Sequence, residues 1–112
     1  MSIPKKSLEL IENSNGNFKA DIIIDAIYGT GFRGEMTDEI RRATAFINRA
    51  NAKVYSLDIP SGLNGDTGLA DPGSVIAQDT LVFHRLKPVH VIAGTNKYCG
   101  WCTLVDIGIR MQ

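Results

Sequence analysis

Two carboxylates stand at or near the ends of apolar runs in this sequence, Asp25 in DIIIDAI and Asp58 in KVYSLDI. A glycine-rich loop follows each run, YGTGFRGE after the first and PSGLNGDTG after the second. In open parallel sheets, ligands bind in the crevice beyond the carboxyl ends of the strands, so the two acids could face one site. They are the first candidates for chemistry.

Asp58 allows two interpretations. As a turn residue, its carboxylate would accept hydrogen bonds from the backbone N–H groups of Ser61, Gly62 or Leu63 and hold the loop in shape. As a functional residue, it would act as a general acid or base, or accept a hydrogen bond from a ligand hydroxyl, because carboxylates at clefts commonly do this work.

Asp25 and Ser61 offer only oxygen atoms, so a metal ion bound by them should be a hard cation rather than zinc. The glycines of the loop 29–35 would let backbone N–H groups approach a phosphate or another anion ahead of a helix. The same glycines would also serve simple tight turns, since the loop lacks the full G-x-G-x-x-G and Walker patterns. Both interpretations remain open on spacing alone.

The pair Cys99 and Cys102 forms C-x-x-C, which suggests redox chemistry. A redox pair of this type normally opens a helix, whereas Cys102 leads into the strand-like TLVDIGI, so this function is disfavoured. A zinc site with His84 and His90 is disfavoured too, because H-x5-H-x8-C-x2-C matches no common ligand spacing. Tyr98 and Trp101 are expected to pack in the core.

The elements that must position these residues alternate between strands and helices. DIIIDAI and KVYSLDI are typical of buried parallel strands, and Thr37 is expected to cap a helix through Asn51 with Ile40 and Ile47 on its apolar face. Strand, loop, helix and strand form a βαβ unit, whose right-handed crossover makes the two strands parallel, so both glycine loops lie at the same edge of the sheet. The remaining expected elements are a short helix at 7–12 and three strands at 80–83, 89–93 and 103–109, with loops between them.

Length and composition exclude several classes of protein. A chain of 112 residues forms at most one domain, and 12 basic residues against 12 acidic ones leave no basic field to attract nucleic acid. The apolar runs are far shorter than the ~20 residues that cross a bilayer, and the N-terminus has no apolar core typical of a secretory signal. The sequence therefore predicts a cytoplasmic protein with no membrane or nucleic-acid partner.

The number of expected helices is too small for the sheet. Parallel strands need cover on both faces, yet only one good helix and one doubtful one accompany about five strands. We therefore expect residues 1–112 to form a single partial domain of the α/β class, with another chain or segment covering the bare face.

Several motifs occur in the order seen in one known family. DAIYGTGFRGE, SLDIPSGLNGDTG, IAQDTLVF with the later K-P, and YCGWCTLVDIGI together resemble the YjeF N-terminal domain, the NAD(P)H-hydrate epimerases. The resemblance covers about residues 20 to 109, and DIPSGLNGDTG is its most specific part. It implies a Rossmann-like three-layer sandwich with a mostly parallel sheet.

The resemblance also implies a function, the interconversion of the R and S epimers of hydrated NADH and NADPH in nicotinamide nucleotide repair. Asp58 would contact the reactive part of the substrate as the catalytic residue, and Asp25 and Ser61 would bind a potassium ion. The remaining contacts to the hydrated nucleotide would come from Gly29, Thr30, Gly31, Phe32, Arg33, Gly34 and Glu35.

One departure from the family is large. Its members carry an Asn-Asn-Gly-Gly-Asp-Gly loop after their first strand, which supplies a further potassium ligand and nucleotide contacts, and this sequence has no such loop. The chain thus resembles the C-terminal half of the domain, and we expect it to associate with the missing N-terminal half or with a second copy of itself. A fused or separate dehydratase would use the product. The alternative function is a non-catalytic binding or dimerisation module of the same fold.

Overall fold

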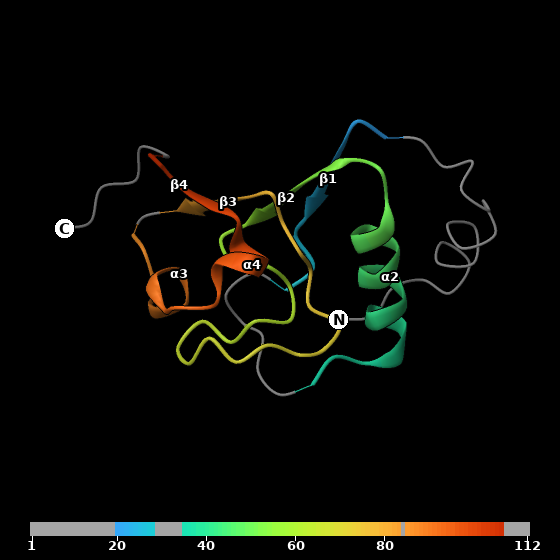
Figure 1. Ribbon diagram of the computed structural model, residues 1–112, viewed down its shortest axis with the longest axis horizontal. Coiled ribbons are helices and arrows are strands. Elements are labelled where there is room, and N and C mark those ends of the chain that lie inside the picture. Colours follow the sequence, from blue (N-terminus) through green and yellow to red (C-terminus); the bar gives the residue numbers. More distant parts are fainter. Residues whose placement is uncertain (1–19, 29–34, 84, 107–112) are drawn as a thin grey trace.

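The computed structural model describes residues 20–28, 35–83 and 85–106, and a parallel sheet runs through them. Four strands are described, in the spatial order β1-β2-β3-β4, and each pairs in parallel with its neighbour. Figure 1 shows the strands side by side, with the helices below them. The strands are β1 (Ile22–Asp25), β2 (Lys53–Leu57), β3 (Asp79–Phe83) and β4 (Trp101–Val105). This confirms the expected α/β class with a parallel sheet.

The helix α2 (Asp38–Arg49) connects β1 to β2, as the sequence predicts. Thr37 is its N-cap, with Oγ1 accepting a hydrogen bond from the Ile40 N–H at 3.3 Å. Asp38 and Glu39 in the first turn meet the positive end of the helix dipole. The βαβ unit brings the loops that follow β1 and β2 to the same edge of the sheet.

One face of the sheet forms the core. Val54 and Ser56 in β2, and Thr80 and Val82 in β3, alternate as buried residues on this face. Val54 packs with partly buried residues of β1 and α2. The other end of the same face is covered by a cluster of Ile59, Leu63, Val89 and Cys99, which brings in the 59–70 loop and the short helices.

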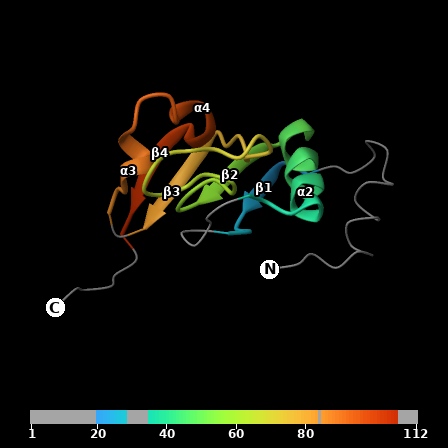
Figure 2. The ribbon, with the colours of Figure 1, turned by 90° about the horizontal axis from the view of Figure 1, so that it is seen from below.

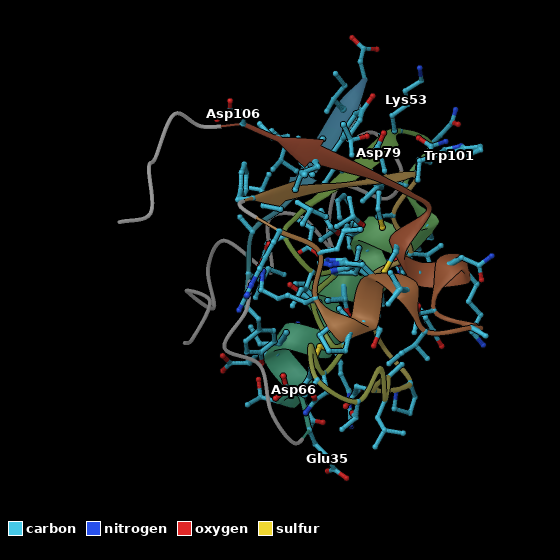
Figure 3. All side chains as sticks on the ribbon, turned by 90° about the vertical axis from the view of Figure 1, so that its left-hand side faces the viewer. Glu35, Lys53, Asp66, Asp79, Trp101 and Asp106 are labelled. Carbon is cyan, nitrogen blue, oxygen red and sulfur yellow. The ribbon has the colours of Figure 1, made fainter. Side chains whose placement is uncertain are left out.

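The opposite face of the sheet is uncovered in the described part of the chain. Ile22 and Ile24 in β1 are 55% and 62% exposed, and Trp101 in β4 is 81% exposed. Figure 3 shows the side chains of Lys53, Asp79 and Trp101 on one side of the molecule, with Glu35 and Asp66 on the opposite side. The expectation that Trp101 packs in the core is therefore wrong, because it lies on the bare face of an edge strand. Tyr98, by contrast, does pack against the core.

The segment between β3 and β4 is helical rather than extended, so the strand expected at 89–93 is wrong. It contains α3 (Pro88–Val91) and α4 (Asn96–Cys99), which Figure 2 shows at one end of the sheet. Pro88 occupies the first turn, where it sacrifices no hydrogen bond, and the Thr95 hydroxyl donates to the Val89 carbonyl at 2.6 Å. A short apolar run has no period that separates strand from helix. The helix expected at 7–12 lies outside the described residues.

Candidate functional site

Asp25 and Ser61 meet at the carboxyl ends of β1 and β2. The Ser61 hydroxyl donates to Asp25 Oδ1 at 2.6 Å, and the Ser61 N–H donates to Asp25 Oδ2 at 2.8 Å. Ser56, the register partner of Asp25 across the sheet, donates its hydroxyl to the same Oδ2 at 2.8 Å. Asp25 and Ser61 are each 1% exposed. The expected proximity of these two residues is therefore confirmed, and Ser56 joins them.

The donor set around Asp25 has the chemistry that a hard monovalent cation requires. No lysine or arginine of the described segments forms an ion pair with Asp25, so its buried charge is met only by hydrogen bonds. The Ser61 oxygen also accepts the Tyr28 N–H at 3.2 Å, which fixes the loop after β1. Carboxylate and hydroxyl oxygens suit a hard cation and do not suit zinc. No cluster of three or more histidine, cysteine or acidic side chains occurs within the described ranges.

Asp58 ends β2 in a left-handed conformation. Its φ is +68°, and among the residues that the structure describes it is the only one other than glycine with a positive φ. Aspartate tolerates this region better than most residues, but holding it there still costs of order 1 kcal/mol. The kink turns the chain out of the sheet at Pro60, as the proline predicts.

The Asp58 carboxylate does not bond to the loop N–H groups that the turn interpretation predicts as its partners. The Ser61 N–H goes to Asp25, and the Leu63 N–H goes to the Pro60 carbonyl at 3.1 Å. The Asp58 carboxylate instead forms an ion pair with Lys87, whose Nζ lies 2.9 Å from Oδ1. The other oxygen, Oδ2, is buried and has no hydrogen-bond partner in the described structure. Asp58 is thus held by a distant segment and not by its own loop.

The two acids belong to separate hydrogen-bond networks at one sheet edge. Asp25 is bonded to the serines of β2 and of its following loop, whereas Asp58 is bonded to the segment before α3. The Ser61 loop connects the two networks, three residues after Asp58. The arrangement places a cluster of oxygen donors at Asp25 beside a second carboxylate, Asp58, that has one buried and unpartnered oxygen.

Most of the loop expected to contact the nucleotide, residues 29–34, lies outside the described residues. Its last residue, Glu35, is exposed and lines a surface hollow of about 330 Å³. This hollow lies between the start of α2 and the 64–72 loop, and its other lining residues are Arg41, Asn64, Leu69, Ala70, Asp71 and Pro72. The contacts predicted for Gly29 to Gly34 therefore remain predictions.

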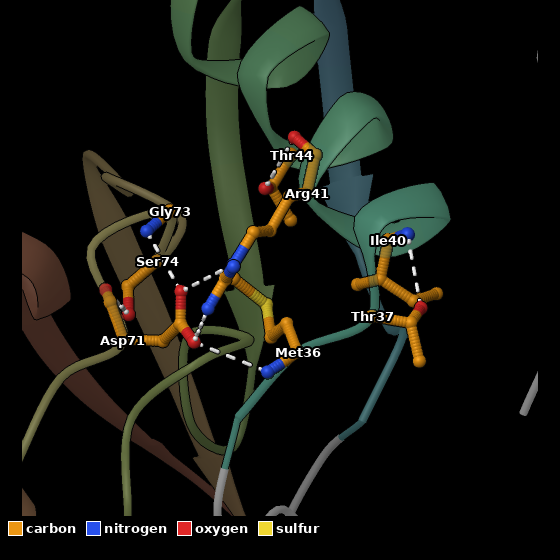
Figure 4. A network of polar contacts seen from close by, with 8 residues as sticks. All are labelled: Met36, Thr37, Ile40, Arg41, Thr44, Asp71, Gly73 and Ser74. Carbon is orange, nitrogen blue, oxygen red and sulfur yellow. Dashed lines mark hydrogen bonds and ion pairs between the residues drawn. The ribbon is translucent and has the colours of Figure 1, made fainter.

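Asp71 fastens the end of the 64–72 loop to α2, a role that the sequence does not predict. Its carboxylate accepts the Met36 N–H at 3.1 Å and both Nε and Nη2 of Arg41, at 3.2 and 2.8 Å (Figure 4). The Gly73 N–H adds a fourth bond at 2.9 Å. The Arg41 hydrogen bond outweighs burial and, with these N–H groups, lowers the pKa of Asp71 from 3.8 to about 2. The signal in the sequence is weak, because Asp71 looks like an ordinary turn residue before Pro72.

The cysteine pair does not have the properties of a redox site. Cys99 ends α4 and is buried, and burial raises the pKa of its thiol from 9.0 to about 12. Burial also raises the pKa of Cys102 in β4. Low thiol pKa values are what a redox pair requires, so the thiol function is not supported.

His90 is also engaged in structure rather than in metal binding. Its Nδ1 accepts the Lys87 N–H at 2.8 Å, and its Nε2 lies 2.6 Å from the Asp58 carbonyl oxygen. His84, the other zinc ligand considered from the sequence, lies outside the described residues.

None of the helices in the described residues combines the length and the apolar character of a membrane span.

Comparisons with known proteins place the chain in a family. The chain matches the family described as YjeF-related protein N-terminus over residues 2–89. It is 48% identical over 90 residues to the bifunctional NAD(P)H-hydrate repair enzyme Nnr of Methanothermobacter thermautotrophicus, covering 80% of this chain and 17% of that protein. It is 35% identical over 91 residues to the NAD(P)H-hydrate epimerase of Pirellula staleyi, covering 81% of this chain and 40% of that protein.

A third relative extends the match along the chain. The NAD(P)H-hydrate epimerase of Oenococcus oeni is 33% identical over 110 residues, which is 91% of this chain and 52% of that protein. The chain therefore spans only about a fifth to a half of the length of these three relatives. From the matched residues 2–89 and these identities, the chain belongs to the YjeF-related protein N-terminus family.

Proposed function

We propose that this chain forms one wall of an NAD(P)H-hydrate epimerase site and takes part in interconverting the R and S epimers of hydrated NADH and NADPH. The observation that carries the proposal is the pair of buried acids, Asp25 and Asp58, at the carboxyl ends of two adjacent parallel strands. Two curated relatives carry the name of this activity, which supports the same conclusion. The reaction is an isomerisation and needs no oxidant or reductant.

Asp58 is the residue that we assign to the chemistry. Inverting a carbon that bears a hydroxyl group requires one bond at that carbon to break and to re-form on the opposite face. The carbon that bears the hydroxyl is also bonded to the ring nitrogen. A carboxylate beside it would accept the hydroxyl proton as the C–N bond breaks, so that the C–O bond becomes a carbonyl and the bonding pair goes to the nitrogen. Attack of the nitrogen on the opposite face of the carbonyl would re-form the C–N bond as the proton returns to the oxygen, with no net change in protons. The unpartnered Oδ2 of Asp58 is a suitable acceptor.

Asp25 and Ser61 would hold a potassium ion in the complete site. When bound, the ion would supply positive charge beside the strand ends, where Asp25 otherwise lacks a cationic partner in the described structure. The loop from Gly29 to Glu35 would contact the nucleotide. Both assignments follow the family pattern and are consistent with the oxygen-only donor set at Asp25.

The other wall of the site must come from elsewhere. The sequence lacks the Asn-Asn-Gly-Gly-Asp-Gly loop, and the face that carries Ile22, Ile24 and Trp101 is uncovered in the described part. Exposed apolar faces of this kind mark surfaces that bind another protein element. We propose that the chain associates through this face with a polypeptide segment that supplies the loop, or with a second copy of itself, and that a dehydratase uses the product.

A non-catalytic module of the same fold is the second candidate. The left-handed backbone and the unpartnered oxygen of Asp58 favour the enzyme, because a binding scaffold has no use for a strained, half-satisfied buried acid.

The test is a direct assay. The purified R epimer of hydrated NADPH is incubated with the chain, alone and together with a polypeptide that carries the asparagine–glycine half, and the S epimer is measured by chromatography. We expect conversion above the rate in buffer when both halves are present. Binding of the substrate without faster conversion would support the non-catalytic module and contradict the epimerase.

Association is measured on the same samples by light scattering. The chain alone is expected to form dimers or larger species, and to become a discrete complex when the complementary half is added. A compact monomer that does not bind the added half would contradict the partial-domain interpretation.

A further inference from the structure

The residues that hold Asp58 come from the segment that begins α3, far along the chain. Lys87 Nζ lies 2.9 Å from Asp58 Oδ1, across 29 residues of sequence. The Lys87 side chain is 30% exposed and the Asp58 side chain only 10%, so the pair is partly shielded from water. An ion pair in this setting restricts the carboxylate more firmly than an exposed pair would.

His90 fixes the backbones of the same two residues relative to each other. Because Nδ1 accepts the Lys87 N–H, the ring proton is on Nε2, which donates to the Asp58 carbonyl oxygen at 2.6 Å. One imidazole therefore joins the main chain of Lys87 to the main chain of Asp58. The distance between the lysine and the acid is thus set by the fold and does not depend on a flexible side chain alone.

The result of these contacts is an asymmetric carboxylate. Oδ1 is occupied by Lys87, while Oδ2 is buried and unpartnered within the described residues. Leaving a buried oxygen without a partner costs about 1 to 3 kcal/mol. Together with the left-handed backbone at Asp58, this is a cost that a purely structural ion pair would avoid.

We propose that Lys87 is a positioning residue for Asp58: it binds Oδ1 and so leaves Oδ2 as the unpartnered oxygen that would bond to the hydroxyl group of the hydrated nicotinamide ring in the complete site. This inference rests on the proposed epimerase function and adds a residue to it. Lys87 acts through Asp58 and does not itself bind the substrate. The competing interpretation is a structural ion pair whose loss only weakens the fold.

Lys87→Met tests the inference. The variant is assayed in the preparation that is active in the epimerase assay, either the chain alone or the chain together with the polypeptide that carries the asparagine–glycine half. Misplacing a reacting group costs about 10- to 100-fold in rate, so we expect kcat to fall by that factor. We expect KM to stay within about twofold, because an interaction that matters only in the transition state lowers kcat alone. Lys87→Arg keeps a cation at Oδ1 and should recover part of the rate. Lys97→Met, the same change at an exposed lysine of α4 on the covered side of the sheet, is the control and should leave kcat unchanged.

A double variant distinguishes positioning from direct action. If Lys87 works through Asp58, adding Lys87→Met to Asp58→Asn should lower kcat no further than Asp58→Asn alone. If the losses in kcat of the two single variants multiply in the double variant, then Lys87 acts independently of Asp58 and the inference is overturned. An unchanged kcat in a folded Lys87→Met variant would overturn it while leaving the epimerase function intact. Absence of epimerisation in the wild type would rule out both.

Discussion

The Ser61 hydroxyl donates to Asp25 Oδ1 over 2.6 Å and joins two residues that are 36 positions apart in the sequence. The bond lies between the strand end of β1 and the loop after β2, and the Tyr28 N–H bonds to the same serine oxygen. Because Asp25 and Ser61 are both buried, water cannot replace either partner. This contact organises the proposed cation site before any ion binds.

Ser61→Ala is therefore expected to destabilise the fold. It removes the short hydroxyl bond to the buried Asp25 Oδ1, which then keeps only the longer bond from the Ile27 N–H at 3.3 Å, and it removes the oxygen that accepts the Tyr28 N–H. We expect a loss of about 1 to 3 kcal/mol in the free energy of unfolding. Urea unfolding followed by circular dichroism measures this. Thr103→Val is the control. Its hydroxyl donates to Asp79 at 3.0 Å on the exposed face, where water can replace the bond, so the substitution should change stability by less than about 0.5 kcal/mol. Equal effects of the two substitutions would contradict the account.

Asp71→Asn should cost more, because the carboxylate accepts bonds from Arg41, Met36 and Gly73. We expect a loss of about 2 to 4 kcal/mol, below the value for a fully buried pair since the Arg41 side chain is 37% exposed. Asp21→Asn removes the same charge from an exposed position and serves as the control. A loss no larger than that of Asp21→Asn would show that the Asp71 network contributes little.

The same network predicts a pH dependence. Folding lowers the pKa of Asp71 from 3.8 to about 2, so its stabilising effect is present above pH 4 and is lost as the pH falls toward 2. The difference in unfolding free energy between wild type and Asp71→Asn should therefore shrink across this window. A difference that stays constant from pH 5 to pH 2.5 would contradict the lowered pKa.

The thiols are expected to be unreactive in the native state. Burial raises the pKa of Cys99 to about 12, so almost none of it is thiolate at pH 8. A chromogenic disulfide reagent should label Cys99 only after denaturant is added, and oxidised glutathione should produce no intramolecular disulfide in the folded chain. Fast native labelling of Cys99 would reopen the redox function.

Gly62 and Gly94 form a matched pair for testing the loop after Asp58. Both have positive φ, +107° and +91°. An added Cβ at Gly62 would contact the Ser74 side chain and lie 2.8 Å from its Cα, whereas at Gly94 it would meet nothing within 4 Å. Gly94→Ala should cost only the backbone strain of about 1 to 2 kcal/mol. Gly62→Ala should cost about 1 to 3 kcal/mol more from overpacking, and equal losses would contradict the close approach.

Much of the fold follows from local patterns. Thr37, the acidic first turn and the apolar spacing at Ile40 predict α2 almost to the residue. The parallel βαβ unit then predicts that Asp25 and Asp58 lie at the same edge of the sheet, because their strands end there. The pairing of Asp25 with Ser61 follows from the resemblance to the family. The family motifs give the same site residues from the resemblance.

The parts that escaped prediction depend on contacts between distant segments. The apolar residues at 89–93 have no decisive period, and their helical state is set by Pro88 and by the Thr95 hydroxyl. The partner of Asp58 is a lysine whose position depends on that helix. The exposure of Trp101 depends on whether another element covers that face of the sheet, and a local sequence pattern does not predict this.

The central claim is that Asp58 performs the chemistry at the edge of the sheet, and Asp58→Asn tests it most directly. Asparagine tolerates the left-handed backbone and has nearly the same shape, so the fold should survive, which urea unfolding checks. Epimerisation of hydrated NADPH by the active form should fall by about 100-fold or more, the usual contribution of a general acid or base. A folded Asp58→Asn variant that interconverts the epimers at the wild-type rate would contradict the account.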